Sequence, residues 1–184
     1  MMTCCAHTTS RRCSTLLIAA VTAVTIIADQ VSKLLILQKF QPGEILPVIP
    51  EFFNLTLTFN PGAAFGLWTN LPAGWRESAL GASIALALTV VIIFLRQPMY
   101  QTTLARISLS AILGGALGNI IDRLVYGSVV DFLDVYIGNS HWPAFNVADS
   151  AISLGVIVLV LLPQRKPFAE SAAVPSQQPS SSGE

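Results

Sequence analysis

The chain has 184 residues, of which 53% are hydrophobic and only 11% are charged, and its ten basic and ten acidic residues give a formal net charge of zero. This composition, with a positive mean hydropathy, is typical of a protein with several membrane-spanning helices and excludes an ordinary soluble domain. Net neutrality without a basic cluster argues against nucleic acid as a partner.

Four apolar segments are long enough to cross a bilayer, which takes about 20 helical residues. They cover residues 14–37, 77–95, 102–121 and 146–162. Arg11 and Arg12 precede the first segment, as in a secretory signal, but Asp29, Gln30 and Lys33 stand where a clean cleavage site would be needed. We therefore expect the first segment to be an uncleaved membrane span.

The distribution of lysine and arginine predicts the orientation. Basic residues fall before the first segment, between the second and third, and after the fourth, where four crossings place them on the same side. They are Arg11, Arg12, Arg96, Arg106, Arg165 and Lys166. Because cytoplasmic loops carry the excess of positive charge, both termini should be cytoplasmic. Most acidic residues then lie at or beside the opposite, outer face.

The first outer connection, about residues 38–72, is too long for a simple turn. Within it Leu55, Leu57 and Phe59 alternate with polar residues, a period of two that predicts a half-buried strand. The turn sequence 60–62 follows, Asn-Pro-Gly. We expect a small β-rich subdomain on the outer membrane interface, with its Leu/Phe face toward lipid or substrate.

The predicted fold is thus an all-α membrane protein with four transmembrane helices and this small outer subdomain. Residues 1–13 form a cytoplasmic N-terminal tail, and residues 14–162 form the transmembrane domain. Residues 163–184 form a cytoplasmic C-terminal tail, whose Ser/Pro/Gln-rich part cannot bury enough apolar surface to order itself.

Several polar residues inside the spans follow helical spacing. Asp29 and Lys33 are i,i+4 and can pair on one face of the first helix. This leaves two readings open, a mutually neutralising pair that fixes helix packing or a direct role with substrate. Asn119, Asp122 and Arg123 can project from one side of the third helix, and we expect Arg123 to pair with Asp122 and brace the site.

Two aspartates in apolar settings, Asp131 and Asp149, are the candidate reactive groups, because a carboxylate placed where charge meets lipid is costly and usually functional. Asp149 alone could be an ordinary N-terminal helix charge. Asp131, however, has no nearby cation in the sequence. If the two carboxyls meet, they share a proton at neutral pH. Such a pair suits peptide hydrolysis, with one member as base and the other polarising the scissile carbonyl.

A small proton-coupled membrane transporter is the alternative function, since it would also carry intramembrane carboxylates. Transporters usually contain inverted repeats and broken helices near the midplane. This sequence has no visible repeat, and its acids gather at one end, which favours the peptidase.

Five short segments together resemble the bacterial lipoprotein signal peptidase family, also called type II signal peptidase. They are residues 29–33 (Asp-Gln-Val-Ser-Lys), 59–66 (Phe-Asn-Pro-Gly-Ala-Ala-Phe-Gly), 118–123 (Gly-Asn-Ile-Ile-Asp-Arg), 129–132 (Val-Val-Asp-Phe) and 145–149 (Phe-Asn-Val-Ala-Asp). Each is weak alone, but five in this order on four spans are highly specific. The resemblance covers about residues 16–162.

The resemblance implies that Asp131 and Asp149 form a catalytic aspartyl dyad, and that no metal or organic cofactor is needed. It implies an intramembrane endopeptidase that cleaves prolipoproteins on the amino side of a diacylglyceryl-modified cysteine. The enzyme would be a monomer of the bacterial inner membrane, in contact with lipid, with its site near the outer face. The supporting or substrate-binding residues would be Asn60, Asn119, Asp122, Arg123, Asn146, Ala148, Asp29 and Lys33.

Overall fold

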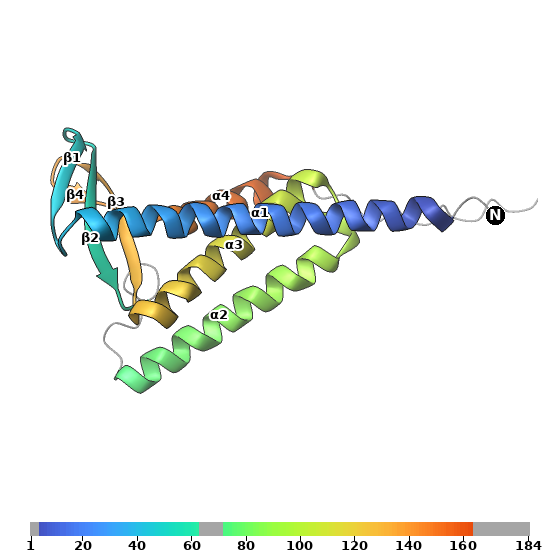
Figure 1. Cartoon of the computed structure of the whole chain (residues 1–184), viewed down its shortest axis with the longest axis horizontal. Helices are drawn as coiled ribbons and strands as arrows, with labels where there is room; N and C mark the ends of the chain where they lie inside the picture. The colour runs from blue at the N-terminus through green and yellow to red at the C-terminus, as the bar shows by residue number, and fades with distance from the viewer. Residues whose placement is uncertain (1–3, 63–71, 164–184) are drawn as a thin grey trace, which may run out of the picture.

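A computed structural model describes residues 4–62 and 72–163 of the chain. Helices form most of the molecule, and a small antiparallel sheet covers one end of it (Figure 1). The elements in chain order are α1 (Cys4–Lys39), β1 (Ile45–Ile49), β2 (Phe53–Asn60), α2 (Ala73–Arg96), the 3-10 helix η2 (Pro98–Tyr100), α3 (Thr103–Tyr126), β3 (Val129–Ile137), β4 (Ser140–His141) and α4 (Val147–Leu161). The mainly helical fold with a small β-rich part is therefore confirmed.

Among the described residues, three helices are long and apolar enough to cross a membrane: Ser14–Lys39 within α1, Glu77–Arg96 within α2, and α3. The predicted fourth span forms α4, which is apolar but has only 15 residues. The four-span count therefore stays a prediction. Of the two predicted tails, residues 1–13 are helical from Cys4 onward, and residues 164–184 lie outside the described residues.

The ends of α3 follow local sequence signals. The Thr102 side chain accepts a hydrogen bond from the Ala105 amide, a typical N-cap. At the other end Gly127 adopts a φ of 71°, the left-handed conformation that favours glycine and ends a helix. The helix thus runs beyond residue 121, where we expected the span to end, and includes Asp122 and Arg123.

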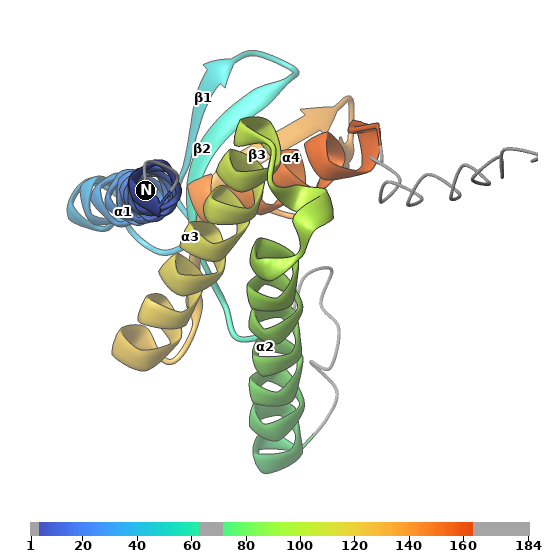
Figure 2. The ribbon, with the colours of Figure 1, turned by 90° about the vertical axis from the view of Figure 1, so that its right-hand side faces the viewer.

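The helix α3 lies in the centre of the bundle, with α1 and α4 packed closely on it and α2 more loosely beside it (Figure 2). Glycines permit this close packing. A Cβ atom on Gly114 would lie 2.7 Å from Thr25 Cβ of α1, and one on Gly155 of α4 would lie 2.6 Å from Ile112 Cγ1 of α3. Small residues are the usual way for membrane helices to bring their backbones together.

The strands follow the order β1-β2-β3-β4, and every adjacent pair is antiparallel. A core of Ile36, Leu57, Val130 and Phe132 joins the sheet to the end of α1. The expected Leu/Phe face toward lipid or substrate is therefore wrong for Leu57, which is only 2% exposed, although Phe59 is 39% exposed. The pairing of β2 with β3 shifts register between Leu55 and Thr58, and this irregularity breaks the simple alternation.

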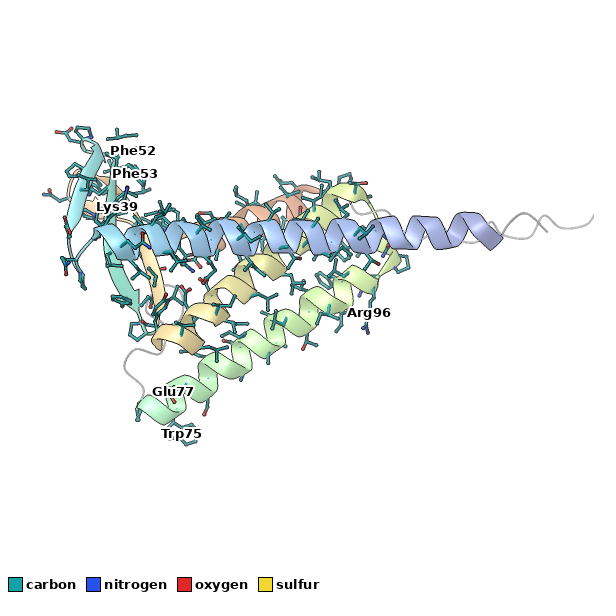
Figure 3. The ribbon with its side chains drawn as sticks, in the orientation of Figure 1. Lys39, Phe52, Phe53, Trp75, Glu77 and Arg96 are labelled. Atoms are coloured by element: carbon teal, nitrogen blue, oxygen red, sulfur yellow. The ribbon has the colours of Figure 1, made fainter. Side chains whose placement is uncertain are left out.

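The charged residues at the ends of the helices mark the two ends of the bundle. Lys39 ends α1 beside the sheet, where Phe52 and Phe53 also lie, whereas Arg96 ends α2 at the opposite end of the molecule (Figure 3). Trp75 and Glu77 lie at the start of α2. The long helices between these ends expose mainly apolar side chains, as expected where a helix faces lipid.

Candidate active site

A cavity of about 620 Å³ opens between the sheet, α3 and α4. Its lining comes from four parts of the chain that are far apart in sequence: the end of β2, the C-terminal part of α3, β3, and the segment that leads from β4 into α4. The polar lining residues include Asn60, Asn119, Arg123, Asp131 and Asp149. The structure therefore brings both candidate catalytic aspartates to one cavity.

Asp131 lies on β3, where its backbone pairs with Thr58 of β2. It is thus held by a sheet, and this strand was not among the predicted elements. The residue is 2% exposed, and two amides donate to its carboxylate. Asn60 Nδ2 lies 3.0 Å from one oxygen and Asn146 Nδ2 lies 2.7 Å from the other.

Asp149 lies in the first turn of α4, and Asn146 is the N-cap of that helix. The Asp149 amide donates to Asn146 Oδ1 over 2.9 Å, and Asn119 Nδ2 donates to Asp149 Oδ1 over 2.8 Å. Asn146 Nδ2 also lies 3.2 Å from Asn119 Oδ1. Asn146 therefore contacts Asp131 with its amide nitrogen and caps the helix that carries Asp149 with its oxygen. The two aspartates are linked through Asn146 and Asn119.

Burial raises the pKa of Asp131 from its ordinary value to about 7. The main cause is loss of solvation, which disfavours the charged carboxylate. The hydrogen bonds from Asn60 and Asn146 act in the opposite direction, and repulsion by Asp149 adds to the rise. A carboxyl with such a pKa can exchange a proton near neutral pH, as a general acid or base must.

The raised pKa of Asp131 predicts how stability depends on pH. The folded chain keeps this proton up to about pH 7, whereas the unfolded chain loses it near pH 4, so the contribution of Asp131 to stability falls as pH rises between these values. Asp131→Asn cannot ionise. Its thermal midpoint in detergent, relative to that of the wild type, should therefore be higher at pH 8 than at pH 5. An equal difference at both pH values would contradict the assignment.

A buried charge network lies behind the cavity, between α1 and α3. Lys33 Nζ is 2.7 Å from a carboxylate oxygen of Asp29 and 2.7 Å from one of Asp122, and it lies 3.1 Å from Asn119 Oδ1. All three charged side chains are at most 2% exposed. Lys33 and Asp29 do not line the cavity, which favours the neutralising pair over a direct role with substrate.

Each carboxylate of this network also holds a backbone amide next to a candidate catalytic residue. Asp29 Oδ1 accepts from the amide of Ala148, which directly precedes Asp149, over 2.9 Å. Asp122 Oδ2 accepts from the amide of Val130, which directly precedes Asp131, over 3.1 Å. Through Lys33, the network therefore connects the backbones that carry the two aspartates.

The expected pair of Arg123 with Asp122 is wrong, because Asp122 pairs with Lys33 instead. Adjacent residues on a helix point in different directions and do not face each other. Arg123 lines the cavity, where its guanidinium donates to the backbone oxygens of Asn119 and Gly62, each over 3.2 Å. It thus ties α3 to the turn that follows β2.

Ala148 is fully buried where α4 packs closely against α3, and this packing leaves little room for a larger side chain. A Cβ atom on Gly115 would lie 2.5 Å from the Ala148 oxygen, and one on Gly118 would lie 2.6 Å from Asp29 Oδ2. The small residues at these positions let α3 approach both α4 and the charge network. Ala148 therefore supports the site through packing and through its amide.

Sequence reasoning missed two contributors to the site. Gln30 Nε2 donates to Asp122 Oδ1 over 2.9 Å and to the Gly118 oxygen over 3.2 Å, and its place in the segment 29–33 was a usable signal. Residues 142–145 line the cavity, and only Phe145 lay in a recognised segment.

Within the described ranges, no three His, Cys, Asp or Glu side chains lie close enough together to hold a metal ion. Activity without a metal stays a prediction.

Comparisons with known proteins show what this chain is similar to. Residues 21–163 match the family model described as signal peptidase (SPase) II. The chain is 46% identical over 140 residues to a lipoprotein signal peptidase of Burkholderia mallei, covering 76% of this chain and 82% of that protein. It is 47% identical, with the same coverage, to the lipoprotein signal peptidase of Burkholderia ambifaria.

Two solved structures of a bacterial membrane enzyme, obtained by the in meso method, have a similar fold. The first is 32% identical with a TM-score of 0.68 and covers 78% of this chain and 84% of its own. The second is 31% identical with the same TM-score and covers 78% and 89%. The sequence resemblance is thereby confirmed. The chain belongs to the signal peptidase II family of membrane proteases, which act in lipoprotein processing.

Proposed function

We propose that this chain is an intramembrane aspartyl endopeptidase that removes signal peptides from bacterial prolipoproteins. It cleaves on the amino side of a cysteine that already carries diacylglycerol. The observation that carries the proposal is that Asp131 and Asp149 line one cavity and are linked through Asn146 and Asn119. Membership of the signal peptidase II family supports the reaction and the substrate class.

In the proposed mechanism, the two carboxyls share one proton at neutral pH, as the raised pKa of Asp131 suggests. The ionised carboxylate takes a proton from a water molecule, whose oxygen attacks the scissile carbonyl carbon. The protonated carboxyl donates to the carbonyl oxygen and stabilises the tetrahedral intermediate. The carbon–nitrogen bond then breaks, and a proton from the dyad goes to the leaving amine. The shared proton is a property of the pair and belongs to neither residue alone.

Asn60 and Arg123 support the substrate side of the cavity in this proposal. Asn60 Oδ1 accepts from the Gly62 amide over 3.0 Å while its Nδ2 donates to Asp131. Arg123 holds the Gly62 oxygen from α3. The turn after β2 is thereby fixed beside the dyad, where the extended peptide around the scissile bond would lie.

The depth of the dyad suits a lipid-anchored substrate. At 1.5 Å per residue, the 15 residues of α4 extend roughly 22 Å, whereas the hydrocarbon core is about 30 Å thick. If α4 ends at the cytoplasmic boundary, Asp149 in its first turn lies below the outer surface, within reach of a diacylglyceryl cysteine. We propose this four-span inner-membrane topology, with cytoplasmic termini and the site near the outer face. We also propose that the monomer is active, because both aspartates and the three asparagines that hold them belong to one chain.

The test is a cleavage assay with the full chain in lipid nanodiscs. A prolipoprotein with diacylglyceryl cysteine should be cut immediately before that cysteine, and the same precursor with an unmodified cysteine should stay intact. The rate should be unchanged by a metal chelator, because the dyad itself activates water. Equal cleavage of both precursors would overturn the proposed specificity, and inhibition by chelator that a divalent ion reverses would overturn the mechanism.

A further inference from the structure

One wall of the cavity is a short stretch between β4 and α4, the wall segment (residues 142–145). Its backbone hydrogen bonds to β3, among the described residues, lie near its two ends. The Trp142 amide donates to the Val135 oxygen over 2.8 Å, and the Phe145 amide donates to the Leu133 oxygen over 3.0 Å. Pro143, between them, has no amide hydrogen. The position of the wall segment therefore depends on what holds its ends.

The residue just before the wall segment, His141, makes a contact that the catalytic proposal does not use. His141 Nδ1 lies 2.9 and 3.1 Å from the two carboxylate oxygens of Asp134 on β3. Asp134 is buried and also accepts from Asn54 Nδ2 of β2 over 2.8 Å. A neutral imidazole with its hydrogen on Nδ1 makes this bond, and a protonated one makes an ion pair, so the contact holds in either state.

A ring contact fixes the imidazole from a second side. The Tyr136 ring stacks on His141 with centroids 4.7 Å apart and planes inclined by 8°. The Tyr136 hydroxyl in turn accepts from the Glu51 amide over 2.9 Å, in the turn between β1 and β2. Asn54, Asp134, Tyr136 and His141 thus form a clasp that joins β2, β3 and the β1–β2 turn to the start of the wall segment.

The clasp is separate from the groups that hold the dyad. Asp131 and Asp149 accept hydrogen bonds from Asn60, Asn119 and Asn146. Among the hydrogen bonds of the described residues, none joins a member of the clasp to either aspartate. Loss of the clasp should therefore leave the reacting carboxyls in place while the start of the wall segment, next to His141, moves.

We propose that the clasp positions the wall segment and so determines how tightly the enzyme holds the part of the substrate that lies beside the dyad. His141 is a positioning residue in this scheme, and it takes no proton from the substrate. The inference rests on the proposed peptidase function for its kinetic consequence, but the position of the wall segment can be measured without it.

The kinetic test uses His141, whose side chain is half exposed, so that its replacement need not unfold the sheet. His141→Ala should raise KM for the lipidated precursor by roughly threefold to tenfold, the factor expected for one lost hydrogen bond, with kcat within about twofold. His141→Asn, whose amide can still donate to Asp134, should recover most of the loss. Ser140→Ala, an exposed neighbour on β4 outside the clasp, is the matched control and should resemble the wild type. A fall in kcat with unchanged KM, or no recovery by His141→Asn, would overturn the proposal.

A second readout follows the wall segment directly. With Trp68→Phe and Trp75→Phe as background, the fluorescence of Trp142 reports its own surroundings. Acrylamide should quench this fluorescence more strongly in His141→Ala than in His141→Asn or Ser140→Ala. Equal quenching in all three variants would overturn the positioning role. If the parent enzyme cleaves no precursor, the proposed function fails, and the quenching comparison alone decides the role of the clasp.

Discussion

Asp131→Asn and Asp149→Asn should each reduce cleavage of the lipidated precursor by at least about 10² to 10⁴-fold, the usual contribution of a general acid or base. An asparagine amide has one acceptor oxygen, so it can keep the bond from Asn119 at position 149 and one of the two bonds from Asn60 and Asn146 at position 131. It can neither accept a proton from water nor share one. Both variants should therefore stay inserted and folded. Cleavage rates and thermal unfolding in the same detergent separate these two effects.

Asp134→Asn is the matched control for this prediction. Asp134 lies on the same strand as Asp131 and is likewise buried, but its carboxylate contacts Asn54 and His141 and lies outside the cavity lining. An amide oxygen in the place of Oδ2 can still accept from both partners, so cleavage should change by no more than the severalfold effect on KM expected for the clasp. Near-normal turnover by either dyad variant, or a loss in Asp134→Asn as large as that in Asp131→Asn, would show that the reacting acids are assigned wrongly.

Lys33→Met should destabilise the folded chain by about 3 to 5 kcal/mol, the usual cost of removing one partner of a buried ion pair. The substitution leaves Asp29 and Asp122 without their shared cation between α1 and α3. Cleavage should also fall, because these carboxylates hold the amides of Ala148 and Val130. The measurements are the thermal midpoint in detergent and the cleavage rate at a temperature where the variant is still folded.

Two comparisons sharpen the Lys33 test. Leu34→Met changes the next residue of α1, which is exposed and makes no part of the network, and should behave like the wild type. Combining Lys33→Met with Asp122→Asn should recover part of the lost stability, because the second substitution removes one of the two carboxylates that have lost their cation. If Lys33→Met unfolds at the wild-type midpoint, the network contributes no measurable stability.

The helices could be predicted from the sequence because membrane spans leave a strong local signal. The ranges expected for the first three spans differ from the observed helices mainly at their ends, where caps such as Gly127 decide the boundary. The β3 strand was not predicted. Residues 129–132 are buried on both faces, because Val130 and Phe132 pack against the end of α1 whereas Val129 and Asp131 point into the cavity, so this part of the strand lacks the alternation of a half-exposed strand.

The partners of individual side chains were harder to predict than the site itself. Asp29 and Lys33 lie one helical turn apart, and their contact follows from spacing alone. The contact of Lys33 with Asp122 joins two helices and has no local signal. By contrast, the error over Arg123 was avoidable, since neighbouring helix positions diverge by about 100°. The geometry of the helix was enough to exclude a pair between Asp122 and Arg123.

The spacing of Asp29 and Lys33 has a consequence for the biogenesis of the protein. The first helix leaves the ribosome long before α3 exists, so its buried charges must enter the membrane without Asp122. The two side chains can neutralise each other within α1 itself, which lowers the cost of inserting each charge alone. When α3 is inserted later, Lys33 can pair with the carboxylate of Asp122 on that helix. The order of synthesis and the final ion pairs are thus compatible. A charge elsewhere on α1, without a partner one helical turn away, would stay unpaired in the membrane until a later helix supplied a counter-ion.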